Sequence, residues 1–166
     1  MKKTLKLTRL SLMLALCILL NFIESFFPIS SAFPGVKAGL SNIPVMFMLI
    51  FVSFPNALTL VLLKGLFVLL SRGVSAGLLS LAGGFLSITV MWGLKKLFKD
   101  KLSFTTLSVS GAVCHNAAQL FITSLMWKTL AVWSISPILI VSGVVFGVIN
   151  ALLLKTAVPY LEKIKS

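Results

Sequence analysis

The stretch from residue 64 to residue 87 reads Lys64-Gly-Leu-Phe-Val-Leu-Leu-Ser-Arg-Gly-Val-Ser-Ala-Gly-Leu-Leu-Ser-Leu-Ala-Gly-Gly-Phe-Leu-Ser87. It places a lysine inside an apolar run, breaks at Ser71-Arg72-Gly73 and enters a second apolar run, which predicts two helices joined by a turn. At a 3.6-residue period, small residues share one face of the second helix, where another helix or a ligand can approach the backbone closely. We interpret this stretch as half of a binding cavity, with a cation at membrane depth beside a smooth face of Gly73, Gly77, Ser80, Gly84 and Ser87.

The composition is that of an integral membrane protein. Of the 166 residues, 58% are hydrophobic and only 11% are charged, whereas soluble domains average about 45–50% and about 25%. The net charge of +12 is compatible with nucleic-acid binding. However, the basic residues lie at the ends of apolar runs, which favours a membrane protein with lipid around it and no nucleic-acid partner.

The hydrophobic pattern predicts a single all-α membrane domain over residues 1–166 with six transmembrane helices. The first apolar run follows a basic start, as in a signal peptide, but it is long and no small-x-small cleavage site follows it. We therefore retain it as an uncleaved helix. The predicted spans cover residues 9–27, 40–53, 57–70, 77–94, 105–127 and 137–156.

The distribution of basic residues predicts the orientation. With alternating spans, most of the 15 lysine and arginine residues fall on the side that holds both termini and the 95–101 segment. By the positive-inside rule both termini are cytoplasmic. We expect a multi-pass protein of the plasma membrane of a bacterium.

Two basic side chains are candidates for a function. Lys64 lies about 10 Å from either end of its predicted helix, at 1.5 Å per residue. A charged lysine near mid-helix costs about 2.5–3.5 kcal/mol, so it usually faces a cavity or a partner. Lys64 can snorkel outward, pair with Glu24 or bind an anion. Arg72 can contact lipid headgroups or hold a phosphate or carboxylate with its planar fork.

The predicted outer half has an excess of positive charge. Its basic residues face a single carboxylate, Glu24, with His115 nearby. A concave surface with this imbalance prefers an anionic ligand. The basic residues of this half are Lys37, Lys64, Arg72 and Lys128.

The predicted fifth helix carries three polar residues near its middle, His115, Asn116 and Gln119. Such residues usually meet one another, another helix or a cavity, so both interhelical hydrogen bonding and ligand contact are possible. Asn42 and Asn150 can join the same polar centre. We expect no metal and no other cofactor, because a lone histidine without nearby carboxylates or a spaced thiolate cannot complete a metal site.

Three segments carry a resemblance to a known family. They are Pro34-Gly-Val-Lys-Ala-Gly-Leu-Ser-Asn42, Arg72-Gly-Val-Ser-Ala-Gly-Leu-Leu-Ser-Leu-Ala-Gly-Gly84 and Gly111-Ala-Val-Cys-His-Asn-Ala-Ala-Gln119. In this order they resemble the family named heptaprenyl diphosphate synthase component I, also called the Gx transporter family. The likeness extends over nearly the whole chain.

That family is similar in size and topology to the S components of energy-coupling factor (ECF) transporters. The resemblance implies a six-helix bundle with an outward-facing pocket, docked on a coupling transmembrane subunit that two ATPases drive. In S components a small-xxx-small face on the first helix contacts the coupling subunit. Ser11 and Ala15 match that role here.

The residues argue against catalysis by the chain itself. A prenyl diphosphate synthase holds magnesium with paired aspartate-rich motifs, whereas this chain has a single aspartate, Asp100. It also has no P-loop, so ATP-driven transport requires other subunits. We expect no enzyme activity.

Three hypotheses follow. The first is the substrate-binding subunit of an energy-coupled importer for a small, partly apolar anion, such as a quinone or isoprenoid precursor or a vitamin, with the Gly77–Gly84 face receiving the apolar body. The second is a non-catalytic membrane subunit of polyprenyl (heptaprenyl) diphosphate synthesis, with a soluble synthase bound at Lys95–Lys101. The third is a structural membrane protein without a ligand. The predicted substrate-binding residues are Lys37, Asn42, Lys64, Arg72, Ser80, His115, Asn116 and Gln119.

Overall fold

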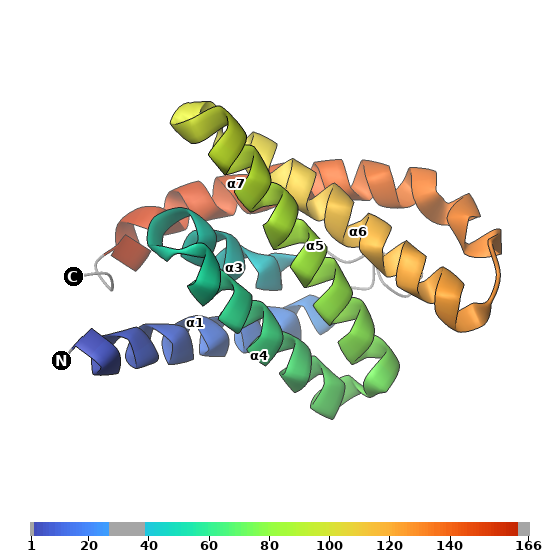
Figure 1. Ribbon diagram of the computed structural model, residues 1–166, viewed down its shortest axis with the longest axis horizontal. Helices are drawn as coiled ribbons and strands as arrows, with labels where there is room; N and C mark the ends of the chain where they lie inside the picture. Colours follow the sequence, from blue (N-terminus) through green and yellow to red (C-terminus); the bar gives the residue numbers. More distant parts are fainter. Residues whose placement is uncertain (1, 27–38, 163–166) are drawn as a thin grey trace.

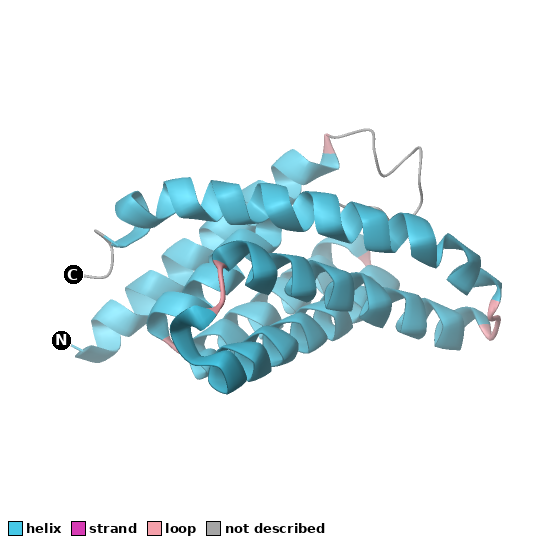
Figure 2. Cartoon of the chain, turned by 90° about the horizontal axis from the view of Figure 1, so that it is seen from above, coloured by secondary structure: helices cyan, strands magenta, loops and turns pink. Residues whose placement is uncertain are grey.

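A computed structural model describes residues 2–26 and 39–162 of the chain (Figure 1). This part is helical, without a strand, and short loops join the helices (Figure 2). The all-α prediction is therefore confirmed for the described residues. The elements are α1 (Lys2–Ser25), η1 (Leu40–Asn42), α3 (Ile43–Phe47), η2 (Met48–Val52), α4 (Phe54–Arg72), α5 (Val74–Phe98), η3 (Lys99–Lys101), α6 (Phe104–Trp127), η4 (Ala131–Ile135) and α7 (Ser136–Glu162).

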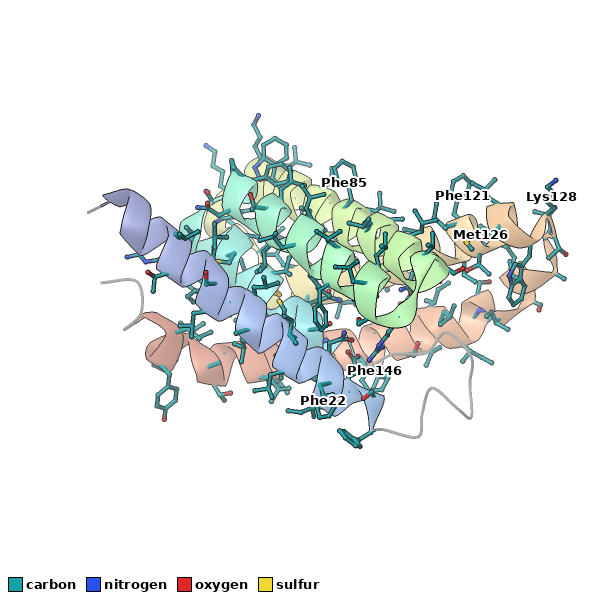
Figure 3. The ribbon with its side chains drawn as sticks, turned by 90° about the horizontal axis from the view of Figure 1, so that it is seen from below. Phe22, Phe85, Phe121, Met126, Lys128 and Phe146 are labelled. Atoms are coloured by element: carbon teal, nitrogen blue, oxygen red, sulfur yellow. The ribbon has the colours of Figure 1, made fainter. Side chains whose placement is uncertain are left out.

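Four segments of the described chain are long and apolar enough to cross a membrane, fewer than the six predicted. They correspond to α1, α4, α5 and α7. The other two predicted spans are also helical, but residues 40–52 form a short segment and α6 carries several polar side chains. Large apolar side chains cover the outside of the bundle, as Phe22, Phe85 and Phe121 illustrate (Figure 3). Such a surface is suited to lipid contact.

The turn predicted after Lys64 consists of one residue. Helix α4 ends at Arg72 and α5 begins at Val74, with Gly73 between them at φ 89° and ψ 171°. Glycine reaches this positive φ without the steric cost that a side chain adds. Because one glycine completes the turn, α5 begins earlier than the predicted residue 77. Helix α1 begins before its predicted span and α7 ends after its predicted span, because the basic segments there continue as helix.

The small-residue face of α5 packs against α4. A Cβ atom placed on Gly77 would lie 2.5 Å from the Cβ of Leu69, and one on Gly84 would lie 2.7 Å from Cγ1 of Val61. Both neighbours belong to α4, which therefore occupies the face at Gly77 and Gly84, whereas Ser80 and Ser87 of the same face line a polar cavity. At these two glycines the prediction is wrong, because the close approach allowed by small residues is used there for helix packing.

The segment 40–52 lies inside the bundle. Residues 43–49 are all buried, and α3 contacts α1, α4 and α7. At 1.5 Å per residue the segment spans roughly 20 Å, less than the approximately 30 Å hydrocarbon core. A short or irregular helix is tolerated at membrane depth when protein surrounds it. At its end, Lys95 of α5 donates a 2.7 Å hydrogen bond from Nζ to the Ile50 carbonyl.

The helices alternate in direction along the bundle. The start of α1, the end of α7 and the α5–α6 connection lie toward one end, whereas the Gly73 turn and the α6–α7 connection lie toward the other (Figure 1). Helix α6 packs between α5 and α7. This arrangement brings residues from distant parts of the sequence to a common interior, where the polar side chains gather.

Candidate functional site

A polar cavity of about 70 Å³ lies among α1, η1, α3, α4, α5, α6 and α7. Lys37 lies outside the described residues, so its position relative to this cavity is not described. Every other predicted substrate-binding residue lines it. These are Asn42, Lys64, Arg72, Ser80, His115, Asn116 and Gln119. The structure thus brings together side chains that are far apart in the sequence.

Lys64 points into the protein. Its side chain is 7% exposed, and its Nζ donates a 2.6 Å hydrogen bond to Oδ1 of Asn42. The interpretation that this lysine snorkels outward is therefore wrong. Because an amide carries no net charge, this bond orients the ammonium group without neutralising it.

Two side chains, the carboxylate of Glu24 and the guanidinium of Arg72, connect α1 to η1 and to α4 beside the cavity. Glu24 of α1 accepts a hydrogen bond from the backbone N–H of Gly39, at the start of η1. Nη2 of Arg72 donates a 3.2 Å hydrogen bond to the Asn21 carbonyl in α1. The carbonyls near the end of a helix carry partial negative charge, which a cation stabilises. Arg72 therefore joins α4 to the last turns of α1, and it has further donors for a ligand.

The His115 ring lies against the backbone of α5. A Cβ atom placed on Gly83 would lie 2.7 Å from Cε1 of His115 and 2.8 Å from both ring nitrogens. Any residue larger than glycine at position 83 would therefore displace the ring. The side chain of His115 is half-buried, and it lines the cavity.

Asn116 makes an interhelical hydrogen bond, one of the two roles considered for the polar group on α6. Its Nδ2 donates to the Leu139 carbonyl of α7 at 2.8 Å. Asn150 of α7 is 6% exposed and also lines the cavity. The polar residues of α6 and α7 therefore contribute to helix packing as well as to the lining.

Several lining residues were missed by the sequence analysis. Ser108 lines the cavity from α6, seven residues before His115, and residues seven apart share one helix face. The polar face therefore extends further along α6 than the sequence analysis recognised. Ser41 of η1 is buried and also lines the cavity, but no local pattern places it there.

A second hollow, of about 720 Å³, lies between α1 and α4. Its walls are mainly apolar, with Ile18 and Phe22 from α1 and Phe67 from α4. Asn21 and Arg72 line both this groove and the polar cavity. The groove could not be predicted from the sequence, because its two walls are separated by about forty residues and have no shared local pattern.

A comparison with protein families gives one match that covers most of the chain. A model for heptaprenyl diphosphate synthase component I matches residues 13–157. The chain belongs to this family. The matched region includes the whole described lining of the polar cavity. No match was found among curated proteins or among solved structures. The similarity to ECF S components stays a prediction.

In this component I protein, the described lining of the polar cavity carries more positive than negative charge. Among the described lining residues, Lys64 and Arg72 face the cavity with one carboxylate, Glu24. Within the described residues, no three histidine, cysteine, aspartate or glutamate side chains come together as metal ligands. The lining therefore offers positive charge and hydrogen-bond donors, the groups that bind phosphate or carboxylate.

Ser11 and Ala15, the residues proposed for a partner subunit, are both exposed on α1. They lie four positions apart, so they belong to one face of the helix. The described lining of the polar cavity includes neither of them, and Ala15 lines the apolar groove between α1 and α4. A partner can therefore reach this face.

Proposed function

We propose that this component I protein is a non-catalytic membrane subunit of heptaprenyl diphosphate synthesis that binds the diphosphate end of a prenyl diphosphate. The observation that supports it is a buried lysine, Lys64, facing the same polar cavity as Arg72. At membrane depth such a cation usually marks a functional site. Two cations beside neutral donors are suited to the charge of a diphosphate.

The size of the cavity limits what it holds. Pockets that enclose a drug-sized ligand are about 300–1,000 Å³, whereas this one is about 70 Å³. It has room for a small polar group and none for an apolar chain. The proposal therefore assigns the cavity to the charged end of the ligand.

The acidic residues explain why catalysis is assigned to another subunit. The whole chain has three of them, Glu24, Asp100 and Glu162, and Glu24 accepts the hydrogen bond from Gly39. A synthase positions magnesium with several clustered carboxylates. In this proposal a separate synthase makes heptaprenyl diphosphate, and the membrane subunit binds the diphosphate end of that product.

Binding of inorganic diphosphate tests the proposal. The full chain is purified in detergent, and affinity is measured by calorimetry for the wild type and for Lys64→Met. We expect the variant to bind about ten- to a hundredfold more weakly, because a hydrogen bond from a charged group contributes about 1.5–3 kcal/mol. Lys128→Met, a change at an exposed residue outside the cavity lining, is the control. Equal affinity of wild type and Lys64→Met would overturn the proposal.

A second candidate is the substrate-binding subunit of an energy-coupled importer in a bacterial plasma membrane. Its support is the end of α4, where Arg72 is the last residue; it lies toward the opposite end of the bundle from the start of α1 and the end of α7 (Figure 1). The positive-inside rule would put both termini in the cytoplasm and Arg72 outside. This candidate takes residues 1–166 as one domain of six spans, with the short segment 40–52 counted as one of them.

The partners distinguish the two candidates. The importer requires a coupling transmembrane subunit with ATPases, bound at the exposed Ser11 and Ala15, and the double change to leucine should abolish their copurification. The synthase subunit instead requires a soluble synthase, bound near Lys95–Lys101. Replacing the exposed Lys96 and Lys99 by glutamate should abolish its capture. Each candidate is rejected if its partner does not copurify with the wild type.

A further inference from the structure

The groove between α1 and α4 has the size of a ligand site. Its volume of about 720 Å³ lies within the range of about 300–1,000 Å³ for pockets that enclose small molecules. The α1 wall includes Leu19 and Phe22, which are 53% and 60% exposed. In Figure 3, α1 lies in front of α4, with Phe22 near the end of α1. The groove is therefore open to the surroundings of the bundle, which in a membrane are lipid chains.

The groove and the polar cavity meet at Arg72 and Asn21. Both residues line both hollows, and the 3.2 Å hydrogen bond between them joins α4 to α1 at this point. An apolar groove thus ends at a guanidinium group, behind which the polar cavity begins. This order of environments, apolar and then cationic, complements a molecule with an apolar chain and an anionic end.

We propose that the α1–α4 groove binds the isoprenoid chain of a prenyl diphosphate, with Arg72 at the junction between chain and diphosphate. The inference rests on the proposed function for the identity of the charged end. The polar cavity is too small for a chain, so the chain must lie outside it, and the groove is an apolar hollow that shares Asn21 and Arg72 with the cavity. A ligand that enters sideways from the bilayer keeps its chain in apolar surroundings throughout.

The same geometry favours a prenyl diphosphate over a membrane phospholipid. The diphosphate is the terminal group of a single chain, so it can enter a narrow polar cavity at the end of the groove. In a phospholipid with an esterified headgroup, such as phosphatidylglycerol, the phosphate is substituted on both sides and the glycerol carries two chains. A cavity of about 70 Å³ does not accommodate that branching.

A variant that fills the groove tests this inference. Ala15 lines the groove from α1 and is exposed, so Ala15→Trp should obstruct the chain. Leu12→Trp is the matched control, because Leu12 is exposed on the same helix and does not line the groove. The probes are geranylgeranyl diphosphate and inorganic diphosphate, each titrated into the full chain in detergent.

We expect the wild type to bind geranylgeranyl diphosphate at least about tenfold more tightly than inorganic diphosphate, because the chain buries apolar surface. Ala15→Trp should lose that advantage and keep its affinity for inorganic diphosphate, whereas Leu12→Trp should change neither. If Ala15→Trp keeps the advantage, the groove assignment is wrong while the proposed function stands. If the wild type binds neither probe, the proposed function fails.

Two further measurements complete the test. Should Ala15→Trp fail to fold, as judged by gel filtration and circular dichroism, Phe67→Ala replaces it and removes apolar surface from the α4 wall. This variant should weaken binding of the prenyl compound alone, and unchanged binding would overturn the inference. In nanodiscs, a tenfold rise in phosphatidylglycerol should leave prenyl binding unchanged. Competition by that lipid would assign the groove to phospholipid and overturn the inference.

Discussion

Lys64 of α4 and Asn42 of η1 are joined by a 2.6 Å hydrogen bond from Nζ to Oδ1 inside the bundle. The two residues are separated by more than twenty positions, and both line the polar cavity. The bond fixes the ammonium group of a buried lysine, and it also attaches the short internal segment to a long apolar helix. Folding and the candidate site therefore depend on the same contact.

Asn42→Ala should lower the free energy of unfolding by about 1.5–3 kcal/mol, because it removes an acceptor from a charged donor at membrane depth. Lys64→Met in the same background should recover part of the loss, since the desolvated charge is then absent. Thermal unfolding in detergent of the wild type, the two single variants and the double variant gives the double-mutant cycle. Additive effects of the two changes would contradict a direct coupling.

Gly83→Ala should destabilise the protein by about 1–3 kcal/mol, because the new methyl group overlaps the His115 ring. Displacement of the ring should also weaken binding of inorganic diphosphate. Gly93→Ala is the matched control on the same helix, where a Cβ atom meets nothing within 4 Å. It should be neutral or stabilise α5 by up to about 1 kcal/mol. Equal melting temperatures for both variants would refute the contact between Gly83 and His115.

Lys95→Met should reduce stability by about 1.5–3 kcal/mol, because the Ile50 carbonyl at the end of the internal segment loses its charged donor. Lys96→Met serves for comparison. Its Nζ lies 5.2 Å from the centre of the Trp92 ring, and such an exposed cation–π contact contributes about 0.5–1 kcal/mol. Chemical unfolding in detergent measures the stability of both variants. A larger loss of stability for Lys96→Met than for Lys95→Met would contradict this prediction. Neither change should alter diphosphate binding, since neither lysine lines the cavity.

Arg72→Lys should weaken binding of inorganic diphosphate by about tenfold, although the charge is kept. An ammonium group cannot reproduce the planar, two-pronged hydrogen bonding of a guanidinium group. Arg72→Gln should weaken binding of inorganic diphosphate further. Binding by this variant should also depend less on salt, because one charge is lost. Calorimetry at two salt concentrations measures both effects. If Arg72→Lys binds as tightly as the wild type, the side chain contributes only its charge.

The helices could be predicted from the sequence, whereas the surfaces between them could not. All six predicted spans correspond to helical segments, and the turn at Gly73 was expected because its glycine and flanking polar residues are local signals. The small-residue face of α5 was recognised, but its neighbour was not. Whether Gly77 faces a ligand or Leu69 depends on how α4 lies against α5, and no local pattern encodes that.

By itself, the sequence determined the class of protein, the helical segments and the presence of a cation at membrane depth. These follow from hydrophobicity, periodicity and charge, which are properties of neighbouring residues. The tertiary structure decided that Lys64 meets Asn42, that the polar cavity is small, and that an apolar groove joins it at Arg72. Cavities arise where helices distant in sequence pack imperfectly, so their size and lining depend on the arrangement of the whole bundle.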